Sequence, residues 1–118
     1  INNRKLIVGR LDGVIAGTLQ LLLQPPNNEA QQKIFNINSH FVAPWARGHG
    51  LAKAMIGKAE STAYENGANY LQLDVRETQE EAIQLYKSRG YKQWGTNPNY
   101  AQVDKKNIKG LYFSKKIK

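Results

Sequence analysis

A short glycine-containing segment, Arg47-Gly48-His49-Gly50, has the residue types best suited to ligand chemistry. It lies between an expected strand ending at Val42 and an expected helix beginning near Leu51. In such a loop the backbone N–H groups and the positive end of the helix dipole converge on one point, which favours a phosphate. Glycine lets a pyrophosphate approach the main chain, because a Cβ atom would stand in its way. The segment therefore predicts a phosphate site, although a plain turn before a helix has a similar composition.

The spacing within this segment separates it from two other phosphate-binding motifs. A dinucleotide fingerprint needs a third glycine or alanine at the position of Lys53, and a P-loop needs Gly-Lys followed by Ser or Thr. Neither pattern is present, so both nucleotide sites are excluded.

The composition limits the remaining chemistry. With no cysteine and two histidines in 118 residues, we expect no disulfide, no thiol nucleophile and no metal site. The net charge of +8 comes from scattered lysines and arginines, so we expect no nucleic-acid partner. No apolar run approaches the roughly 20 residues that span a bilayer, so we expect no membrane partner. The lack of cysteine and of a visible signal peptide fits a cytoplasmic location.

Hydrophobic periodicity and turn residues predict the elements that would position the loop. Asp12-Gly13 readily takes the positive φ angles of a type I′ turn and predicts a hairpin. Thr78-x-x-Glu81 is a capping-box pattern that predicts a helix start, and Gly90 predicts its end. The predicted strands are 5–11, 14–23, 33–42, 71–75, 91–103 with a bulge or turn between Trp94 and Ala101, and 108–117; the predicted helices are 50–66 and 78–89, and 24–30 is a loop.

Alternation along the strand 33–42 assigns its side chains to two faces. We expect Phe35, Ile37, Ser39 and Phe41 on one face, and Ile34, Asn36, Asn38 and His40 on the other.

The order of these elements predicts one mixed α/β domain over residues 1–118, with a parallel pair of strands flanking the first helix. The chain begins with Ile1 and its apolar pattern starts almost at once, so we expect a partial or N-terminally truncated domain.

The pattern Arg-x-x-Gly-x-Ala, formed by Arg47, Gly50 and Ala52, resembles the acetyl-CoA pyrophosphate loop of the GNAT superfamily of N-acetyltransferases. The segments Phe41-Val42-Ala43-Pro44, Leu71-Gln72-Leu73-Asp74-Val75 and Ala82 to Tyr91 also resemble that family's motifs. The agreement in element order runs from Lys5 to Ile117, and the specific motifs lie within residues 41–91. The implied fold is a mixed, mostly antiparallel sheet with a splayed parallel strand pair beside the cofactor-binding helix.

The resemblance implies an enzyme that transfers the acetyl group of acetyl-CoA to a primary amine by direct attack in a ternary complex, without a metal. A non-catalytic acetyl-CoA sensor or interaction domain is the alternative. The implied acceptor is a small-molecule or peptide amine, and the open strand edge at 5–11 suggests a possible homodimer. The residues implied to bind acetyl-CoA are Phe41, Val42, Arg47, Gly48, His49, Gly50, Leu51, Ala52, Lys53, Gln79 and Tyr86.

The resemblance also implies catalytic roles. Tyr86 occupies the place of the family's tyrosine general acid, although a core aromatic residue would have the same spacing. For the base, His40 is a candidate because its ordinary pKa lies near neutrality, with Asp74, Glu77 and solvent as alternatives. Asp74, Trp94 and Tyr100 are expected to line the acceptor site.

Three features depart from the family pattern. The usual strand and helices before the hairpin are absent, Gln79 stands where many members have Asn, and the strand before the loop has no glutamate. These departures concern the acceptor wall, the pantetheine contact and the base.

Overall fold

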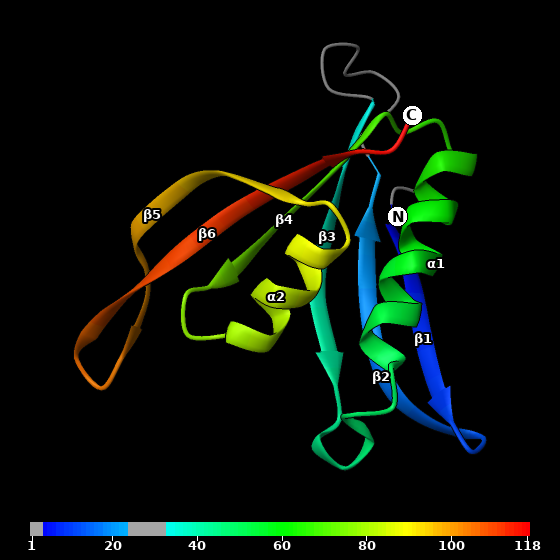
Figure 1. Cartoon of the computed structure of the whole chain (residues 1–118), viewed down its shortest axis with the longest axis horizontal. Coiled ribbons are helices and arrows are strands. Elements are labelled where there is room, and N and C mark those ends of the chain that lie inside the picture. Colours follow the sequence, from blue (N-terminus) through cyan, green and yellow to red (C-terminus); the bar gives the residue numbers. More distant parts are fainter. Residues whose placement is uncertain (1–3, 24–32) are drawn as a thin grey trace. The chain divides into compact units, whose positions relative to one another are not determined.

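The structure, a computed structural model, describes residues 4–23 and 33–118. The predicted loop at 24–30 lies outside them, as does the chain before Arg4. The chain divides into two compact units, Ile1–Leu71 with Ile117–Lys118 and Gln72–Lys116. Strand β4 (Tyr70–Arg76) has residues in both units, and the strand order is β1-β2-β3-β4-β6-β5 (Figure 1). This is the mixed α/β architecture that the sequence predicts.

The first unit contains an antiparallel meander. Strand β1 (Arg4–Leu11) pairs with β2 (Val14–Leu22), and β2 pairs with β3 (Ile34–Val42). Asp12 and Gly13 join β1 to β2 with φ angles of 53° and 79°, which confirms the predicted type I′ turn.

The two faces of β3 differ from the prediction because the strand contains a β-bulge. Asn38 pairs with Gln20 and Phe41 pairs with Thr18, so β3 has one more residue than β2 between these pairs. The extra residue is Ser39, whose φ is 52°. Beyond it, His40 joins the face of Ile37, while Phe41 joins the face of Asn38. The simple alternation was therefore wrong for His40 and Phe41.

Helix α1 (Leu51–Glu65) packs on the face of the meander that carries two glycines. A Cβ atom added to Gly9 would lie 2.7 Å from Met55 Sδ, and one added to Gly17 would lie 2.9 Å from the same atom. The helix therefore approaches β1 and β2 as closely as their main chains permit. The buried hydrophobic residues of β1, β2, β3 and α1 are Ile7, Ala16, Leu19, Leu21, Phe35, Ile37, Met55, Ile56, Ala59 and Ala63.

Helix α1 is a crossover between parallel strands, as predicted. It ends at Glu65, and Gly67 follows with a φ of 92°. The N–H groups of Asn69 and Tyr70 then both donate to the carbonyl of Lys33, so β3 and β4 begin side by side and start in the same direction.

In the second unit, α2 (Glu80–Ser88) follows β4, and a hairpin of β5 (Lys92–Val103) and β6 (Lys106–Lys116) completes the chain. The N-cap of α2 is Gln79 and no side chain caps the helix, so the predicted capping box at Thr78 was wrong. Gly90, with a φ of 92°, ends α2 as predicted.

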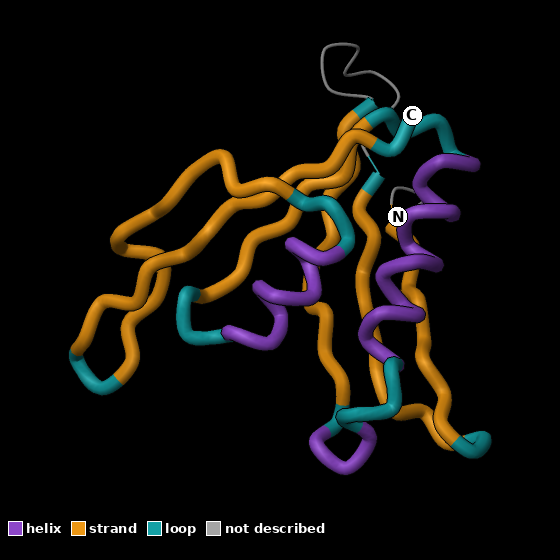
Figure 2. The backbone as a smooth tube through the Cα atoms, viewed as in Figure 1, coloured by secondary structure: helices purple, strands orange, loops and turns teal. Residues whose placement is uncertain are grey.

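The β5–β6 hairpin is more continuous than predicted. Its two register shifts, at Gln93/Gly95 and Asn97/Ala101, confirm the expected irregularity around Trp94 to Ala101 without interrupting β5. Asp104 and Lys105 form the turn with φ angles of 51° and 65°, although neither is glycine. The continuous ribbon of β5 and β6 is visible in Figure 2.

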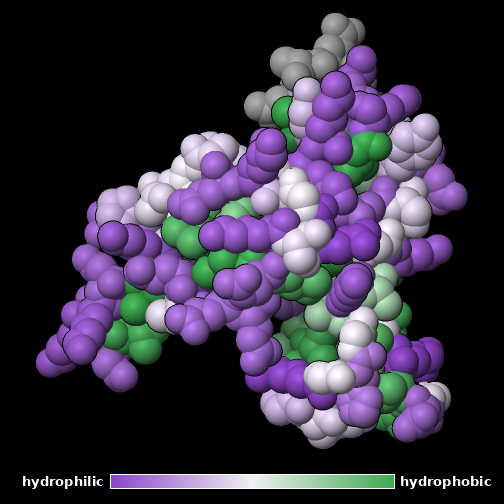
Figure 3. Space-filling model, in the orientation of Figure 1, coloured by the Kyte–Doolittle hydropathy of each residue, from purple (hydrophilic) through white to green (hydrophobic). Residues whose placement is uncertain are grey.

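The face drawn in Figure 3 is mostly hydrophilic, with hydrophobic residues in separate areas. Within the described residues, no helix has the length and apolar character needed to cross a membrane.

The contacts of Gly9 and Gly17 predict which of two alanine substitutions destabilises the fold more. A Cβ atom at Gly17 would meet the Phe41 carbonyl oxygen at 2.9 Å as well as Met55, whereas at Gly9 the nearest atoms all belong to the side chains of Met55 and Leu51. Backbone yields less readily than a side-chain end, so we expect Gly17→Ala to lower the free energy of unfolding by about 1–3 kcal/mol. Gly9→Ala is the matched control with a smaller loss. Urea denaturation measures both, and a larger loss for Gly9→Ala would contradict this packing.

Candidate active site

The predicted phosphate loop follows β3 in the first unit. A short 3-10 helix (Pro44–Ala46) turns the chain after Val42, and the Ala43 N–H donates to the Ala16 carbonyl at 2.8 Å. Figure 2 shows this turn and the loop that leads into α1. The loop is therefore anchored to β2 just before its glycines begin.

Gly48 and Gly50 both have the left-handed conformation that favours glycine. Their φ angles are 86° and 76°, and a Cβ atom added to either would meet no described atom within 4 Å. The main chain here is thus open to a ligand on the side where any other residue would carry a side chain.

The start of α1 is suited to an anion. Gly50 is its N-cap, no side chain caps it, and its first turn contains no acidic residue. The first intrahelical bond at this end runs from the Ala54 N–H to the Gly50 carbonyl, at 3.1 Å. The N–H groups of Leu51, Ala52 and Lys53 therefore precede the first hydrogen bond within the helix and point toward the loop.

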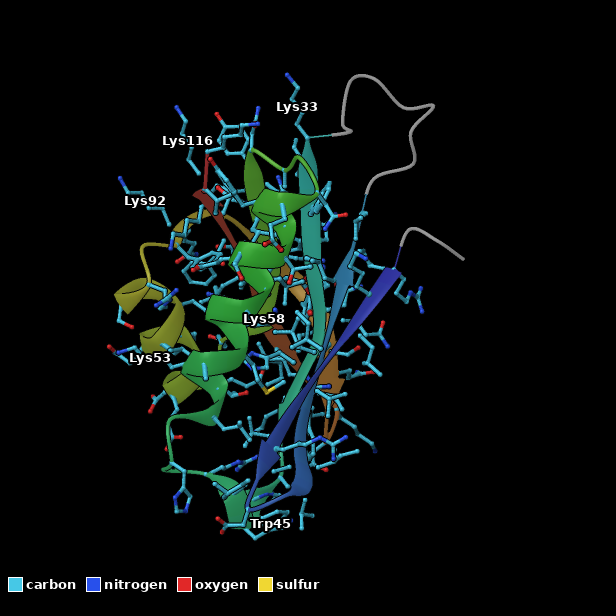
Figure 4. All side chains as sticks on the ribbon, turned by 90° about the vertical axis from the view of Figure 1, so that its right-hand side faces the viewer. Lys33, Trp45, Lys53, Lys58, Lys92 and Lys116 are labelled. Carbon is cyan, nitrogen blue, oxygen red and sulfur yellow. The ribbon has the colours of Figure 1, made fainter. Side chains whose placement is uncertain are left out.

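The charged side chains of the loop have different roles. The Arg47 Nε donates to the Val42 carbonyl at 3.4 Å, so the side chain bends back toward the end of β3. His49 and Lys53 are exposed, and Figure 4 shows Lys53 on the first turns of α1. Of the three, Arg47 is the one held by a described contact.

The end of β3 brings His40, Phe41 and Val42 beside this loop. Val42 pairs with Gly17, and Phe41 is 55% exposed. His40 is half-buried on the face that α1 covers, and burial lowers its pKa from 6.5 to about 4. His40 is therefore neutral at neutral pH, but it is a much weaker base than an ordinary histidine.

In the second unit, Tyr86 is a buried residue of α2 with 5% of its surface exposed. Its ring contacts Tyr91 edge-on, with 6.0 Å between centroids, and lies 6.4 Å from the Phe113 ring. Burial raises the pKa of Tyr86 from 10.0 to about 12, and the negative charge of Asp74 adds to this shift. The phenol thus stays protonated over the whole physiological pH range.

Asp74 and Tyr100 are brought together as an interacting pair. The Tyr100 hydroxyl donates a hydrogen bond to Asp74 Oδ2. The pKa of Tyr100 is raised to about 12 by burial, which is the largest cause, and by the hydrogen bond and charge of Asp74, whereas the charge of Arg76 lowers it. Asp74 therefore influences both Tyr86 and Tyr100.

Two polar residues next to α2 have structural partners. The Gln79 Oε1 accepts from the Arg76 N–H at 3.3 Å, so its amide nitrogen is the part that remains to donate to a ligand. Glu77 exchanges two bonds with β6: its N–H donates to the Lys109 carbonyl, and its carboxylate accepts from the Lys109 N–H at 2.8 Å. This engagement counts against Glu77 as a base.

Trp94 belongs to an aromatic cluster that the sequence did not predict in full. Its ring lies 5.4 Å from that of Tyr112, which in turn lies 6.2 Å from that of Tyr100. Tyr112 is the member that was missed. The available signal was its place two residues after Gly110 on an alternating strand.

Within residues 4–23 and 33–118, no three His, Cys, Asp or Glu side chains gather in an arrangement that could hold a metal ion.

The coupling through Asp74 predicts opposite effects for two neutralising substitutions. Asp74→Asn should lower the pKa of both Tyr86 and Tyr100, because the carboxylate raises both. Arg76→Gln should instead raise the pKa of Tyr100. Titration of ¹³C-labelled tyrosine by NMR resolves the individual residues. Shifts of Tyr100 in the same direction in both variants would contradict this arrangement.

The buried histidine predicts a stability change at acid pH. His40 has a pKa of about 4 in the folded chain against 6.5 in the unfolded chain, so the unfolded chain binds more protons between these values. Stability should be full above pH 6.5 and fall as the pH drops toward 4, by on the order of 3 kcal/mol. His40→Gln should remove this component from urea titrations across that range, whereas His49→Gln, at an exposed position, should retain it. Equal pH profiles for the wild type and His40→Gln would refute the assignment.

Comparison with known proteins places the chain among acetyltransferases. Residues 1–91 match the family model described as the acetyltransferase (GNAT) family. Over 79 residues the chain is 52% identical to an uncharacterised N-acetyltransferase in the hisH-hisA intergenic region of Azospirillum brasilense. That match covers 67% of this chain and 47% of the relative, so the chain spans about half the length of the curated protein it matches.

Solved structures show the same fold. An N-acetyltransferase from Staphylococcus aureus Mu50 has a TM-score of 0.88 and 21% identity, covering 99% of this chain and 70% of that one. The yncA protein of Salmonella typhimurium, solved with its cofactor acetyl-CoA, has a TM-score of 0.85 and 15% identity, covering 98% and 65%. These likenesses confirm the predicted fold, and the family match extends through the loop and α2. The chain belongs to the GNAT acetyltransferase family.

Proposed function

We propose that this chain binds acetyl-CoA at the Arg47–Ala52 loop and transfers the acetyl group to a primary amine in a ternary complex. The observation that carries the proposal is the open, left-handed glycine pair at the uncapped start of α1. Family membership and the acetyl-CoA in the related yncA structure support this choice of ligand.

Different residues would bind different parts of acetyl-CoA. The N–H groups of Gly48 to Lys53 would hold the pyrophosphate, and the helix dipole would favour its charge. The exposed His49 and Lys53 would approach the outer phosphates, while Arg47 holds the loop against Val42. Main-chain N–H groups near Phe41 and Val42 would polarise the thioester carbonyl, and the Gln79 amide nitrogen would contact the pantetheine arm.

The reaction joins the amine nitrogen to the acetyl carbon and breaks the bond from that carbon to sulfur. The products are an acetamide and the free thiol, and the amine loses one proton. The protein must therefore stabilise the departing sulfur and provide a route for that proton.

Tyr86 is our candidate for the group that acts on the sulfur. Its pKa of about 12 keeps the phenol protonated, so it can donate a hydrogen bond as the carbon–sulfur bond breaks. Complete transfer to a free thiolate is unfavourable, because an ordinary thiol has a pKa of about 8.5. We therefore expect a contribution of about 10²-fold, at the lower end for acid–base groups.

Solvent is our candidate for accepting the amine proton. His40, with its pKa of about 4, takes a proton from an ammonium poorly, although its neutral ring can accept a hydrogen bond from the amine. A positioning role for His40 on the covered face of β3 agrees better with its burial than a role as the principal base.

Calorimetric titration of acetyl-CoA tests the loop. Gly50→Ala should weaken binding at least tenfold, because its Cβ atom would occupy the open space that the pyrophosphate needs. Gly13→Ala is the matched control: Gly13 also has a positive φ, 79°, and open space, but it lies in the β1–β2 turn. A similar loss in both variants would show that backbone strain, rather than a blocked site, is responsible.

Steady-state assays with a primary amine then test the transfer. Tyr86→Phe should lower kcat about 10²-fold and leave the affinity for acetyl-CoA nearly unchanged. Binding without turnover by the unmutated chain would favour the alternative, a non-catalytic acetyl-CoA sensor. Absence of acetyl-CoA binding would overturn the proposal.

A further inference from the structure

We propose that Trp94, Tyr100, Tyr112 and Asp74 form a subsite for a second cationic group of the acceptor, which makes a diamine or polyamine the preferred substrate class. This inference rests on the proposed acetyl transfer to an amine. All four residues belong to the second unit.

The register of the β5–β6 hairpin places the rings on one face. Gly110 and Tyr112 lie two residues apart on β6, opposite Asn97 and Gly95, and share a face. Phe113 points to the other face, where its ring approaches Tyr86 of α2. The cluster therefore occupies the side of the hairpin opposite to α2.

The two irregularities of β5 bring Trp94 and Tyr100 onto this face. Trp94 is the extra residue between the pairs Gln93–Phe113 and Gly95–Tyr112, and its ring lies against Tyr112. The residues between Asn97 and Ala101 form the second irregularity, and the Asn97 Oδ1 accepts from the Asn99 N–H at 2.9 Å. Both departures from regular pairing turn an aromatic residue toward the same place.

Gly110 allows Tyr100 to reach Asp74. A Cβ atom at Gly110 would overlap the Tyr100 ring, so the ring lies directly on the β6 main chain. From there the Tyr100 hydroxyl donates to Asp74 Oδ2. A carboxylate is thus fixed at the edge of an aromatic surface.

This combination favours a positive ligand. Aromatic ring faces attract an ammonium group, and a neighbouring carboxylate adds charge attraction and accepts its N–H groups. Elsewhere, rings of this chain already associate with lysines: Lys115 Nζ lies 5.5 Å from the Tyr91 centroid and Lys118 Nζ lies 5.9 Å from that of Tyr64.

Stabilisation of the hairpin alone explains the cluster less well. Cross-strand aromatic pairs stabilise a sheet mainly by burying their surface, yet Trp94 is 58% exposed. The charge of Arg76 lowers the pKa of Tyr100, opposite to the effect of Asp74.

Equilibrium binding tests the subsite without catalysis. Trp45→Phe leaves Trp94 as the one tryptophan of the chain, since the sequence contains two. We expect 1,4-diaminobutane and spermidine to change Trp94 fluorescence saturably, and butylamine to bind at least tenfold more weakly. Asp74→Asn and Tyr112→Leu should each remove most of this preference, whereas Tyr64→Leu, an exposed ring of α1, should retain it. Loss of the preference in Tyr64→Leu as well would overturn the subsite.

Acetylation assays separate this inference from the proposed function. We expect a higher kcat/KM for the diamine than for butylamine, with Tyr112→Leu reducing their ratio at least fivefold mainly through KM. Acetylation of butylamine without any diamine preference in binding would overturn the subsite and leave the proposed function intact. Preferential diamine binding without acetyl transfer would overturn the proposed function and support the cation subsite.

Discussion

The close contact of α1 with Gly9 and Gly17 is the constraint on which the first unit depends. The helix can lie this near β1 and β2 only because both strands lack a Cβ atom under Met55. Its axis is then fixed, and with it the place of its first turn, where Gly50 leaves the N–H groups uncapped. The missing Cβ atoms of Gly9 and Gly17 thus determine where the open start of α1 lies, although neither glycine belongs to the loop.

In the second unit the charge of one carboxylate, rather than close packing, connects residues of different elements. Asp74 accepts from Tyr100 and raises the pKa of Tyr86, so a single carboxylate on β4 influences a residue of α2 and a residue of β5. The carboxylate favours the protonated form of both phenols. Acceptor recognition and sulfur protonation, as we propose them, would therefore respond together to any change at this position.

The features predicted correctly from sequence were those governed by local backbone chemistry. Asp12-Gly13 specifies its turn, Gly90 ends α2, and the glycines around His49 take positive φ angles in the turn before α1. The errors arose where tertiary contacts overrode a local rule. Ser39 takes a positive φ without being glycine and reverses the faces of His40 and Phe41, while Tyr112 acquires its partners only through the bulges of the opposite strand. The burial of His40 and its lowered pKa do not follow from strict alternation, because both depend on the bulge at Ser39.

The bulge at Ser39 also affects which genetic changes β3 can tolerate. Deletion of one residue between Ile37 and Phe41 would restore regular pairing with Phe41 still opposite Thr18, so His40 and Phe41 would both keep their faces. Regular pairing at the present length would instead shift the register beyond Asn38, turn the exposed phenylalanine toward the core and turn the half-buried imidazole outward. As the chain diverges, loss of the extra residue should therefore be tolerated better than a substitution that removes the bulge without shortening β3.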